Sequence, residues 1–243
     1  MAGRYAQAVM VNPHKEVDRS VYPFTLPVFQ GFNSLEFHQD VTFFVGENGS
    51  GKSTLMEAIA IQAKLPAEGG MRQHSFSTYD SHSEFWDSLI LVRGDYEAEA
   101  MFLRAESFYN VASYVNRMAR EAGGVARFGD IHSRSHGEGF LDAIASLKPP
   151  GFYLMDEPES ALSFQGQLTL MAHMKRLIDE GSQFVIATHS PILLGFGSAW
   201  IYEFSEDGIE RRGYRETQNY KMMRDFLENR ERYARMLGLG AVD

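Results

Sequence analysis

A nine-residue stretch rich in glycine constrains this chain more than any other part of its sequence. It runs from Gly46 to Thr54, reads Gly-Glu-Asn-Gly-Ser-Gly-Lys-Ser-Thr, and directly follows the apolar run Val41 to Val45. The apolar run is β-branched and aromatic, which is typical of a short strand buried on both faces. From Lys52 to Lys64 apolar residues recur at helical spacing, and Pro66 ends that pattern. We therefore expect a strand, a tight glycine loop and a helix in this order.

The glycine loop has the composition of a phosphate cradle. Glycine permits backbone angles that a Cβ would penalise, so successive N–H groups can turn inward, and the following helix adds the positive end of its dipole. Lys52 is expected to reach the β- and γ-phosphates of a nucleoside triphosphate, and the Ser53 hydroxyl is expected to ligate Mg²⁺. The residues predicted to bind the nucleotide are Asn48, Gly49, Ser50, Gly51, Lys52, Ser53 and Thr54.

A second apolar run, Phe152 to Met155, ends in the acids Asp156 and Glu157. It is typical of a buried strand that delivers carboxylates to its C-terminal end, the edge at which open α/β sheets bind ligands. We expect Asp156 to hold Mg²⁺, directly or through water. Glu157 is expected to orient or deprotonate the water that attacks the γ-phosphate. Taken alone, the pattern also fits an ordinary strand end followed by an acidic turn.

A third buried-strand pattern, Gln183 to Ala187, runs into Thr188, His189 and Ser190. A neutral His189 is suited to contact the γ-phosphate or the attacking water, and one of its hydroxyl neighbours is expected to fix its orientation. A lone histidine at a strand end is more often structural or merely exposed. The prediction for His189 therefore depends on the presence of the glycine loop and of Asp156 and Glu157 in the same chain.

Together these segments resemble the ATP-binding-cassette (ABC) ATPases. The glycine loop looks like the Walker A motif of that family, Asp156-Glu157-Pro158 looks like Walker B, and Thr188-His189-Ser190 looks like its switch. Between the first two, Arg134 to Phe140 is similar to the ABC signature in a serine-x-glycine-glutamate form. The resemblance covers roughly residues 20 to 205. Within the family, the chain resembles soluble AAA/SMC-like ATPases rather than a typical transporter subunit.

The resemblance implies an α/β P-loop NTPase fold of the ABC type. Its mostly parallel central sheet would be flanked by helices, with an antiparallel β-subdomain and a small helical lobe. It also implies ATP and Mg²⁺ as cofactors, catalytic roles for Lys52, Glu157 and His189, and an ATP-dependent head-to-tail homodimer. The signature residues that would face the nucleotide of the opposite protomer are Ser135, Gly137 and Glu138. Free amides at a helix start form an anion site, which suits that role.

The sequence departs from the family pattern in three places. Glu106 stands where the glutamine of the glutamine loop is expected, and Gln73 is a poorer candidate for that role. Ser163 stands where the D-loop usually closes with aspartate. In the family an aromatic residue upstream of Walker A usually stacks on adenine. Tyr22 and Phe24 are the candidates for this role, and both could equally be core residues.

Composition bounds the remaining possibilities. With 243 residues, 44% of them hydrophobic, the chain can bury a substantial core, and residues 1–243 are most simply one ABC-type ATPase domain. It contains no cysteine, which excludes disulfides and zinc held by thiolates. It also contains no apolar run of about 18 residues, so we expect a soluble, cytoplasmic protein.

Three further elements follow from local patterns. Residues 1–40 should form strands of the antiparallel subdomain, and residues 89–93 and 97–103 are expected to form a hairpin across Gly94-Asp95. A helix is expected over residues 107–121. Another is expected at about 216–237, packed against the domain, with a partner-binding helix as the alternative.

Three classes of function fit these observations. The first is an ATP-hydrolysing engine of a DNA-repair- or defence-like complex, with DNA or a protein as partner. The charge of −9 argues against a general polyanion binder, but residues 211–235 hold eight basic and four acidic side chains. The second is the nucleotide-binding subunit of a membrane transporter, and the third is a slow ATP-gated clamp. The missing glutamine disfavours the second class, and Glu157 disfavours a purely non-hydrolytic switch.

Overall fold

The buried apolar runs of the sequence become the middle strands of a seven-stranded sheet. The computed structural model describes residues 5–72, 84–121, 123, 128 and 136–240. Its sheet has the order β10-β9-β3-β8-β7-β6-β4, and the four central pairs, from β9 to β6, are parallel. The strands are β3 Val41–Gly46, β4 Gly70–Met71, β6 Glu99–Arg104, β7 Gly151–Asp156, β8 Gln183–Ala187, β9 Ala199–Ser205 and β10 Gly208–Arg212. A mostly parallel sheet was the prediction, and it is confirmed.

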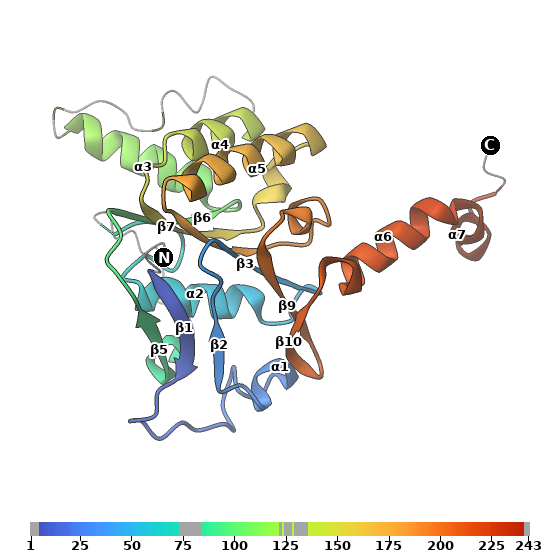
Figure 1. The fold of residues 1–243 in the computed structure, drawn as a ribbon, viewed down its shortest axis with the longest axis horizontal. Coiled ribbons are helices and arrows are strands. Elements are labelled where there is room, and N and C mark those ends of the chain that lie inside the picture. Colours follow the sequence, from blue (N-terminus) through green and yellow to red (C-terminus); the bar gives the residue numbers. More distant parts are fainter. Residues whose placement is uncertain (1–4, 73–83, 122, 124–127, 129–135, 241–243) are drawn as a thin grey trace.

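Helices cover both faces of this sheet, which is why its central strands are apolar without alternation (Figure 1). Phe44 of β3 belongs to the core shared with α2, whereas its neighbours Phe43 and Val45 belong to the core shared with α3, α4 and α5. The helices are α2 Lys52–Gln62, α3 Phe108–Glu121, α4 His136–Ala145 and α5 Phe164–Asp179. The predicted order of strand, glycine loop and helix is therefore present, with α2 ending two residues before Lys64.

A second, three-stranded antiparallel sheet lies beside α2. It has the order β2-β1-β5 and consists of β1 Ala6–Val11, β2 Ser34–Glu36 and β5 Leu89–Arg93. The predicted hairpin of residues 89–93 with 97–103 is wrong. β5 pairs with β1, whereas β6 pairs in parallel with β7 in the main sheet. The four consecutive buried residues Ala100 to Leu103 explain the difference, because such a strand needs apolar neighbours on both of its faces.

Short helices complete the body of the molecule. They are α1 Pro27–Gln30, η1 Glu84–Ser88, η2 Pro158–Ala161, η3 Leu193–Gly195 and η4 Tyr214–Glu216. No helix in the described ranges is both long enough and apolar enough to cross a lipid bilayer.

The C-terminal segment differs from the prediction in two respects. Instead of one helix over residues 216–237 there are two, α6 Gln218–Glu228 and α7 Arg230–Leu237, which we call the C-terminal arm. Asn229 separates them with a non-helical backbone, and its amide Nδ2 donates to the Asp225 carbonyl (3.1 Å) and carboxylate (2.9 Å). The expectation that this segment packs against the domain is also wrong, because the arm projects away from the sheet (Figure 1) and Met222 and Leu237 are exposed.

Candidate functional site

The glycine loop links β3 to α2 at the C-terminal edge of the sheet. Gly46 and Gly51 have φ angles of 154° and 94°. A Cβ at Gly46 would lie 2.4 Å from the Phe204 carbonyl oxygen, and one at Gly51 would lie 2.8 Å from the Phe29 ring. Both the angles and the contacts therefore require glycine, since β9 and α1 press on the loop from outside.

Lys52, the first residue of α2, is almost completely buried. Its Nζ donates to the carbonyl oxygens of Gly46 (2.9 Å) and Glu47 (2.8 Å), so the amine folds back over the glycine loop. Burial lowers the pKa of Lys52, and the nearby carboxylates of Glu157 and Asp156 oppose that shift. The amine is thus a cation held at the loop that a phosphate would occupy.

A pocket of about 440 Å³ opens beside the loop, and Glu106, Glu157 and Tyr22 are among the residues that line it. The Tyr22 ring is 57% exposed, and its hydroxyl lies 3.2 Å from Thr54 Oγ1. Phe24 is buried instead, with its ring edge-on to Phe85 at 5.2 Å. Of the two aromatic candidates for stacking on adenine, the structure places Tyr22 at the pocket and Phe24 in the core.

The two predicted metal ligands come together from separate elements. Ser53 lies in the first turn of α2, and its Oγ donates to Asp156 Oδ1 at the end of β7 over 3.3 Å. A hydroxyl and a carboxylate are the oxygen donors that Mg²⁺ prefers, and Mg²⁺ usually completes its shell with water and substrate phosphate. The donor set therefore fits Mg²⁺. The described residues contain no cluster of three or more acidic or histidine side chains that would form a metal cage without the nucleotide.

Arg104 is a site residue that the sequence reasoning missed. The register of β6 with β7 places it opposite Asp156, and its Nε lies 3.5 Å from Asp156 Oδ2 while Nη1 lies 2.7 Å from Glu57 Oε1. Burial raises the pKa of Asp156 to about 6, against the opposing effects of the Arg104 charge and the Ser53 hydrogen bond. Only the order of the strands reveals this contact, because no local pattern marks an arginine at a strand end as the neighbour of a distant acid.

Glu157 leaves β7 with a left-handed backbone, φ 50° and ψ 50°. This conformation costs a non-glycine residue free energy, and such outliers cluster at functional sites. Its backbone N–H donates to the Ala187 carbonyl at 2.9 Å, which ties it to the end of β8. The carboxylate consequently turns toward the next strand, where Oε1 lies 3.4 Å from His189 Nε2.

His189 is held through its backbone. Its N–H donates to Glu159 Oε1 (2.5 Å), and its carbonyl accepts from Asn219 Nδ2 (2.8 Å) at the start of α6. Its Nε2 is buried and has no hydrogen-bond partner among the described residues. The 3.4 Å between Nε2 and Glu157 Oε1 is longer than an ordinary hydrogen bond.

The hydroxyl neighbours of His189 do not have the role expected of them. Thr188 Oγ1 accepts from the Ser190 N–H (3.0 Å), and Ser190 Oγ donates to Gln167 Oε1 of α5 (2.5 Å). Both hydroxyls fix the loop on which His189 stands, and neither is bonded to its imidazole.

The predicted signature lies partly outside the described residues, which exclude Ser135 and also Gln73. Gly137 and Glu138 lie in the first turn of α4. A Cβ at Gly137 would lie 2.9 Å from the Ala161 carbonyl oxygen, so the start of α4 packs tightly on η2, which follows Glu157. Glu138 is exposed.

Two family models and two relatives match parts of this chain. Residues 27–82 match a family model described as "AAA domain", and residues 139–195 match one described as "AAA domain, putative AbiEii toxin, Type IV TA system". The "Putative ABC transporter ATP-binding protein PH0132" of Pyrococcus horikoshii is 28% identical over 242 residues, covering 85% of this chain and 92% of that protein. A Pyrococcus furiosus protein of the same description, PF0068, is 28% identical over 222 residues, covering 79% and 85%.

Among solved structures, cbiO1 of Clostridium perfringens, described as part of the ABC transporter complex cbiONQ, superimposes with a TM-score of 0.51. It is 15% identical, and the match covers 96% of this chain and 99% of that one. At this identity the likeness concerns the fold alone.

The strand, glycine loop and helix define a P-loop NTPase, together with a parallel strand, β7, that ends in Asp156 and is separated from β3 only by β8. Within that class, the AAA matches and the ABC relatives, together with the fold, support assignment of the chain to the ABC ATPase superfamily. Membership of this superfamily supports ATP hydrolysis as its activity.

Proposed function

We propose that the chain, as a single ATPase domain of residues 1–243, binds ATP with Mg²⁺ at the C-terminal edge of β3, β7 and β8 and hydrolyses it there. One observation carries this proposal: β3, β7 and β8 are neighbours in one parallel sheet, and side chains that follow their ends converge. Ser53 meets Asp156 at 3.3 Å, and Glu157 meets His189 at 3.4 Å.

Each of these side chains has a distinct task. The glycine loop from Asn48 to Thr54 would cradle the phosphates with its amides, and the Lys52 ammonium would leave the carbonyls it now caps to pair with the β- and γ-phosphates. Ser53 and Asp156 would hold Mg²⁺, which when bound neutralises the charge that develops on the phosphate oxygens.

Glu157 is the proposed general base. Its side chain is part-exposed beside the pocket, as a group that must reach a water molecule needs to be. His189 would contact the γ-phosphate or the attacking water through Nε2, the atom without a hydrogen-bond partner among the described residues. Burial of a polar atom without a partner costs free energy, so a ligand that satisfies Nε2 gains affinity.

The site is proposed to be completed by a second copy. Resemblance to the ABC family implies that Ser135, Gly137 and Glu138 of one protomer face the nucleotide held by the other, so that two ATP molecules lie between two chains. The position of Gly137 and Glu138 in the first turn of a ten-residue helix supports an anion site there. Binding would close the dimer and hydrolysis would open it.

For the work that hydrolysis drives, we favour an engine of a DNA-repair- or defence-like complex. Glu106 at the nucleotide pocket, in place of a glutamine, supports this choice. The description of the second AAA match, which names a toxin of a toxin–antitoxin system, is compatible with it. The second candidate is the nucleotide-binding subunit of a membrane transporter. The two Pyrococcus relatives favour it, because both are described as putative ABC transporter ATP-binding proteins.

ATP turnover by the purified protein, beside Glu157→Gln and with or without DNA, tests these alternatives. We expect Mg²⁺-dependent turnover that Glu157→Gln reduces by about 10²-fold or more, since general-base catalysis contributes about 10² to 10⁴ in rate. Stimulation by DNA, lost when Arg211, Arg212 and Arg215 are neutralised, would support the first candidate. Turnover indifferent to DNA but raised by a co-purifying membrane protein would favour the second.

A further inference from the structure

The C-terminal arm carries an exposed row of large apolar side chains. On α6, Met222, Met223, Phe226 and Leu227 follow the i, i+1, i+4, i+5 spacing of one helix face, and Met222 and Leu227 are 57% and 70% exposed. Met236 and Leu237 continue the exposure on α7. Contiguous apolar surface of this kind usually marks an interaction site.

The arm is held in a fixed shape. At the bend between its helices, Asp225 accepts hydrogen bonds from the Tyr233 hydroxyl (2.6 Å) and the Asn229 amide (2.9 Å). The Phe226 ring packs edge-on against Tyr233 with 5.4 Å between centroids. A surface that is already ordered loses less conformational entropy on binding, so the arm is prepared for a partner.

The charge of the arm indicates what kind of surface it fits. Residues 218–237 hold five basic and three acidic side chains in a chain whose net charge is −9. Two arms would therefore repel one another. A partner surface that fits the arm would offer apolar residues to its exposed methionine, phenylalanine and leucine side chains, and acidic residues to its basic ones.

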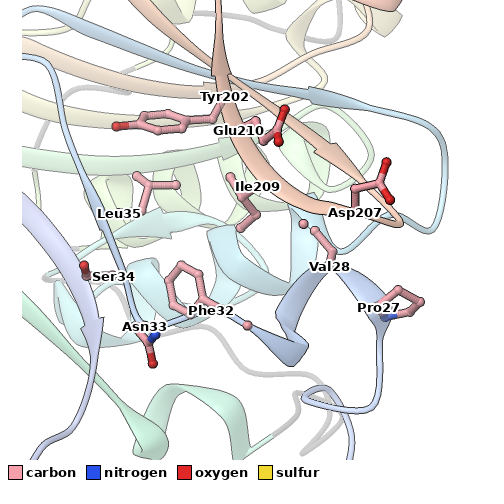
Figure 2. A pocket seen from close by; sticks show the side chains of 12 residues that line it. Pro27, Val28, Phe32, Asn33, Ser34, Leu35, Tyr202, Asp207, Ile209 and Glu210 are labelled. Atoms are coloured by element: carbon pink, nitrogen blue, oxygen red, sulfur yellow. The ribbon is translucent and has the colours of Figure 1, made fainter.

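A pocket that combines apolar and acidic residues lies on the body of the same chain. A pocket of about 330 Å³ is formed by α1, β2 and the β9–β10 hairpin, and we call it the hairpin pocket (Figure 2). Figure 2 shows Ile209 and Glu210 of the hairpin above Phe32 and Leu35, with Asp207 at the hairpin turn near Val28. Phe32 and Leu35 are almost completely buried and form the floor of the pocket, whereas Asp207 and Glu210 are exposed. Glu210 pairs with Arg212, whereas Asp207 has no basic partner among the described residues.

We infer that the arm of one copy docks in the hairpin pocket of a second copy, and that the exchange is reciprocal. The two complementary surfaces occur on one chain but lie apart within it, because the arm points away from the body (Figure 1). Reciprocal contacts of this kind are what a two-fold symmetric dimer makes. The eleven residues of α6 span about 16 Å. α7 extends the arm beyond the bend at Asn229, so the arm projects past the body of its own chain and can contact a neighbouring copy (Figure 1).

The inference deepens the proposed two-copy ATPase by naming a contact that needs no nucleotide. The arm begins beside the proposed site, since Asn219 donates to the His189 carbonyl (2.8 Å) and the Tyr214 hydroxyl donates to the Pro191 carbonyl (3.0 Å). A copy that holds the arm would therefore pull on the loop that carries His189.

Disulfide cross-linking tests the contact, and the absence of native cysteine makes the result specific. Protein carrying Leu227→Cys is mixed with protein carrying Asp207→Cys, without nucleotide, and oxidised. We expect a cross-linked dimer that contains one chain of each variant. The matched control replaces Asp207→Cys by Tyr96→Cys, which lies at an 86% exposed position away from the hairpin pocket. Equal cross-linking in the control, or none with the Asp207 variant, would overturn the inference.

Sedimentation without nucleotide provides the second measurement. We expect a dimer whose dissociation constant rises at least tenfold when Met222 and Leu227 both become serine, and likewise for Asp207→Lys. All three substitutions change exposed side chains, so the variants should keep wild-type circular dichroism and ATP binding. Lys52→Ala should leave this dimer intact although it removes any ATP-bridged one, which separates failure of the inference from failure of the proposed function. A wild-type protein that stays monomeric at high concentration without nucleotide would overturn the arm contact.

Discussion

The C-terminal edge of the sheet, where we propose that the nucleotide binds, meets the C-terminal arm at His189. The two regions are stabilised in different ways. At the edge, Asp156 is the last residue of a fully buried strand that pairs with the strands on either side, and the next residue, Glu157, is held by the hydrogen bond of its N–H to the Ala187 carbonyl. The arm touches the domain mainly at its base and is ordered by contacts within itself, such as those of Asp225. The edge can therefore hold reacting groups in place. The arm keeps its own shape but has few contacts with the domain, so it can move as a unit when a partner binds it.

The largest effect is expected at the edge, from Lys52→Ala. Loss of the ammonium removes the charge that offsets the phosphates, so ATP binding should fall below detection in calorimetry. The matched control is Lys175→Ala, which removes an exposed lysine whose only ion pair among the described residues is with Asp179. Wild-type affinity in the Lys52 variant would show that the glycine loop is not the phosphate site.

His189→Ala should lower kcat by about a hundredfold and leave ATP binding within a few-fold of wild type, because the residue is proposed to act on the γ-phosphate or the water. Steady-state kinetics and equilibrium binding separate the two effects. His173→Ala, which alters a histidine on α5, serves as the control. If kcat is unchanged in the His189 variant, the residue is only structural.

Asp156→Asn should stabilise the protein when neither Mg²⁺ nor nucleotide is present. Because burial raises the pKa of Asp156 from 3.8 to about 6, its contribution to stability is fully present below pH 4 and is lost as the pH rises through 6. The variant avoids that loss, so at pH 8 it should gain about 3 kcal/mol at most. Its advantage should shrink as the pH falls from 6 to 4.

Thermal unfolding of both proteins across this pH range measures the difference. Addition of Mg²⁺ and ATP should reverse the order, since only the aspartate holds the metal. An Asn variant that is less stable than wild type at pH 8 would mean that the Arg104 contact outweighs the cost of burial.

Tyr22→Ala should weaken ATP binding by about tenfold, since stacking of a base on an aromatic ring is worth about 1–3 kcal/mol. Tyr22→Phe keeps the ring and should keep the affinity. Phe24→Ala is the informative contrast, because that buried ring should instead cost about 3–5 kcal/mol of folding stability. Equal affinities for Tyr22→Ala and wild type would remove Tyr22 from the adenine site.

The smallest effect on stability is expected in the arm. Leu227→Ser should change the free energy of unfolding by no more than about 0.5 kcal/mol in dilute solution, because the side chain is already exposed. Phe108→Ala, in the core between α3 and α4, should cost about 3–5 kcal/mol. A large loss for Leu227→Ser in a monomeric sample would show that the arm packs on its own domain.

The difference between the two regions also explains what the sequence could predict. Buried strands and the glycine loop have strong local patterns, so the central sheet, α2 and the convergence of Ser53 with Asp156 followed from the sequence. The role of Arg104 could not be predicted, because its contact with Asp156 depends on the order of the strands in the sheet. The predicted hairpin of residues 89–93 with 97–103 was wrong for the same reason. An apolar run predicts a strand, but it does not show with which other strands that strand pairs. The course of the arm depends on the break at Asn229, which helical periodicity alone does not mark.

The most direct test of the central claim is the ATP turnover of an equimolar mixture of two variants, Lys52→Ala and Ser135→Asp. The first removes the phosphate cation, and the second places a negative charge where the γ-phosphate of the opposite chain is expected. Each protein alone should be inactive, and the mixture should regain turnover, because mixed dimers contain one site with Lys52 from one chain and Ser135 from the other. A mixture as inactive as its components, or full activity of Ser135→Asp alone, would contradict a site shared by two chains.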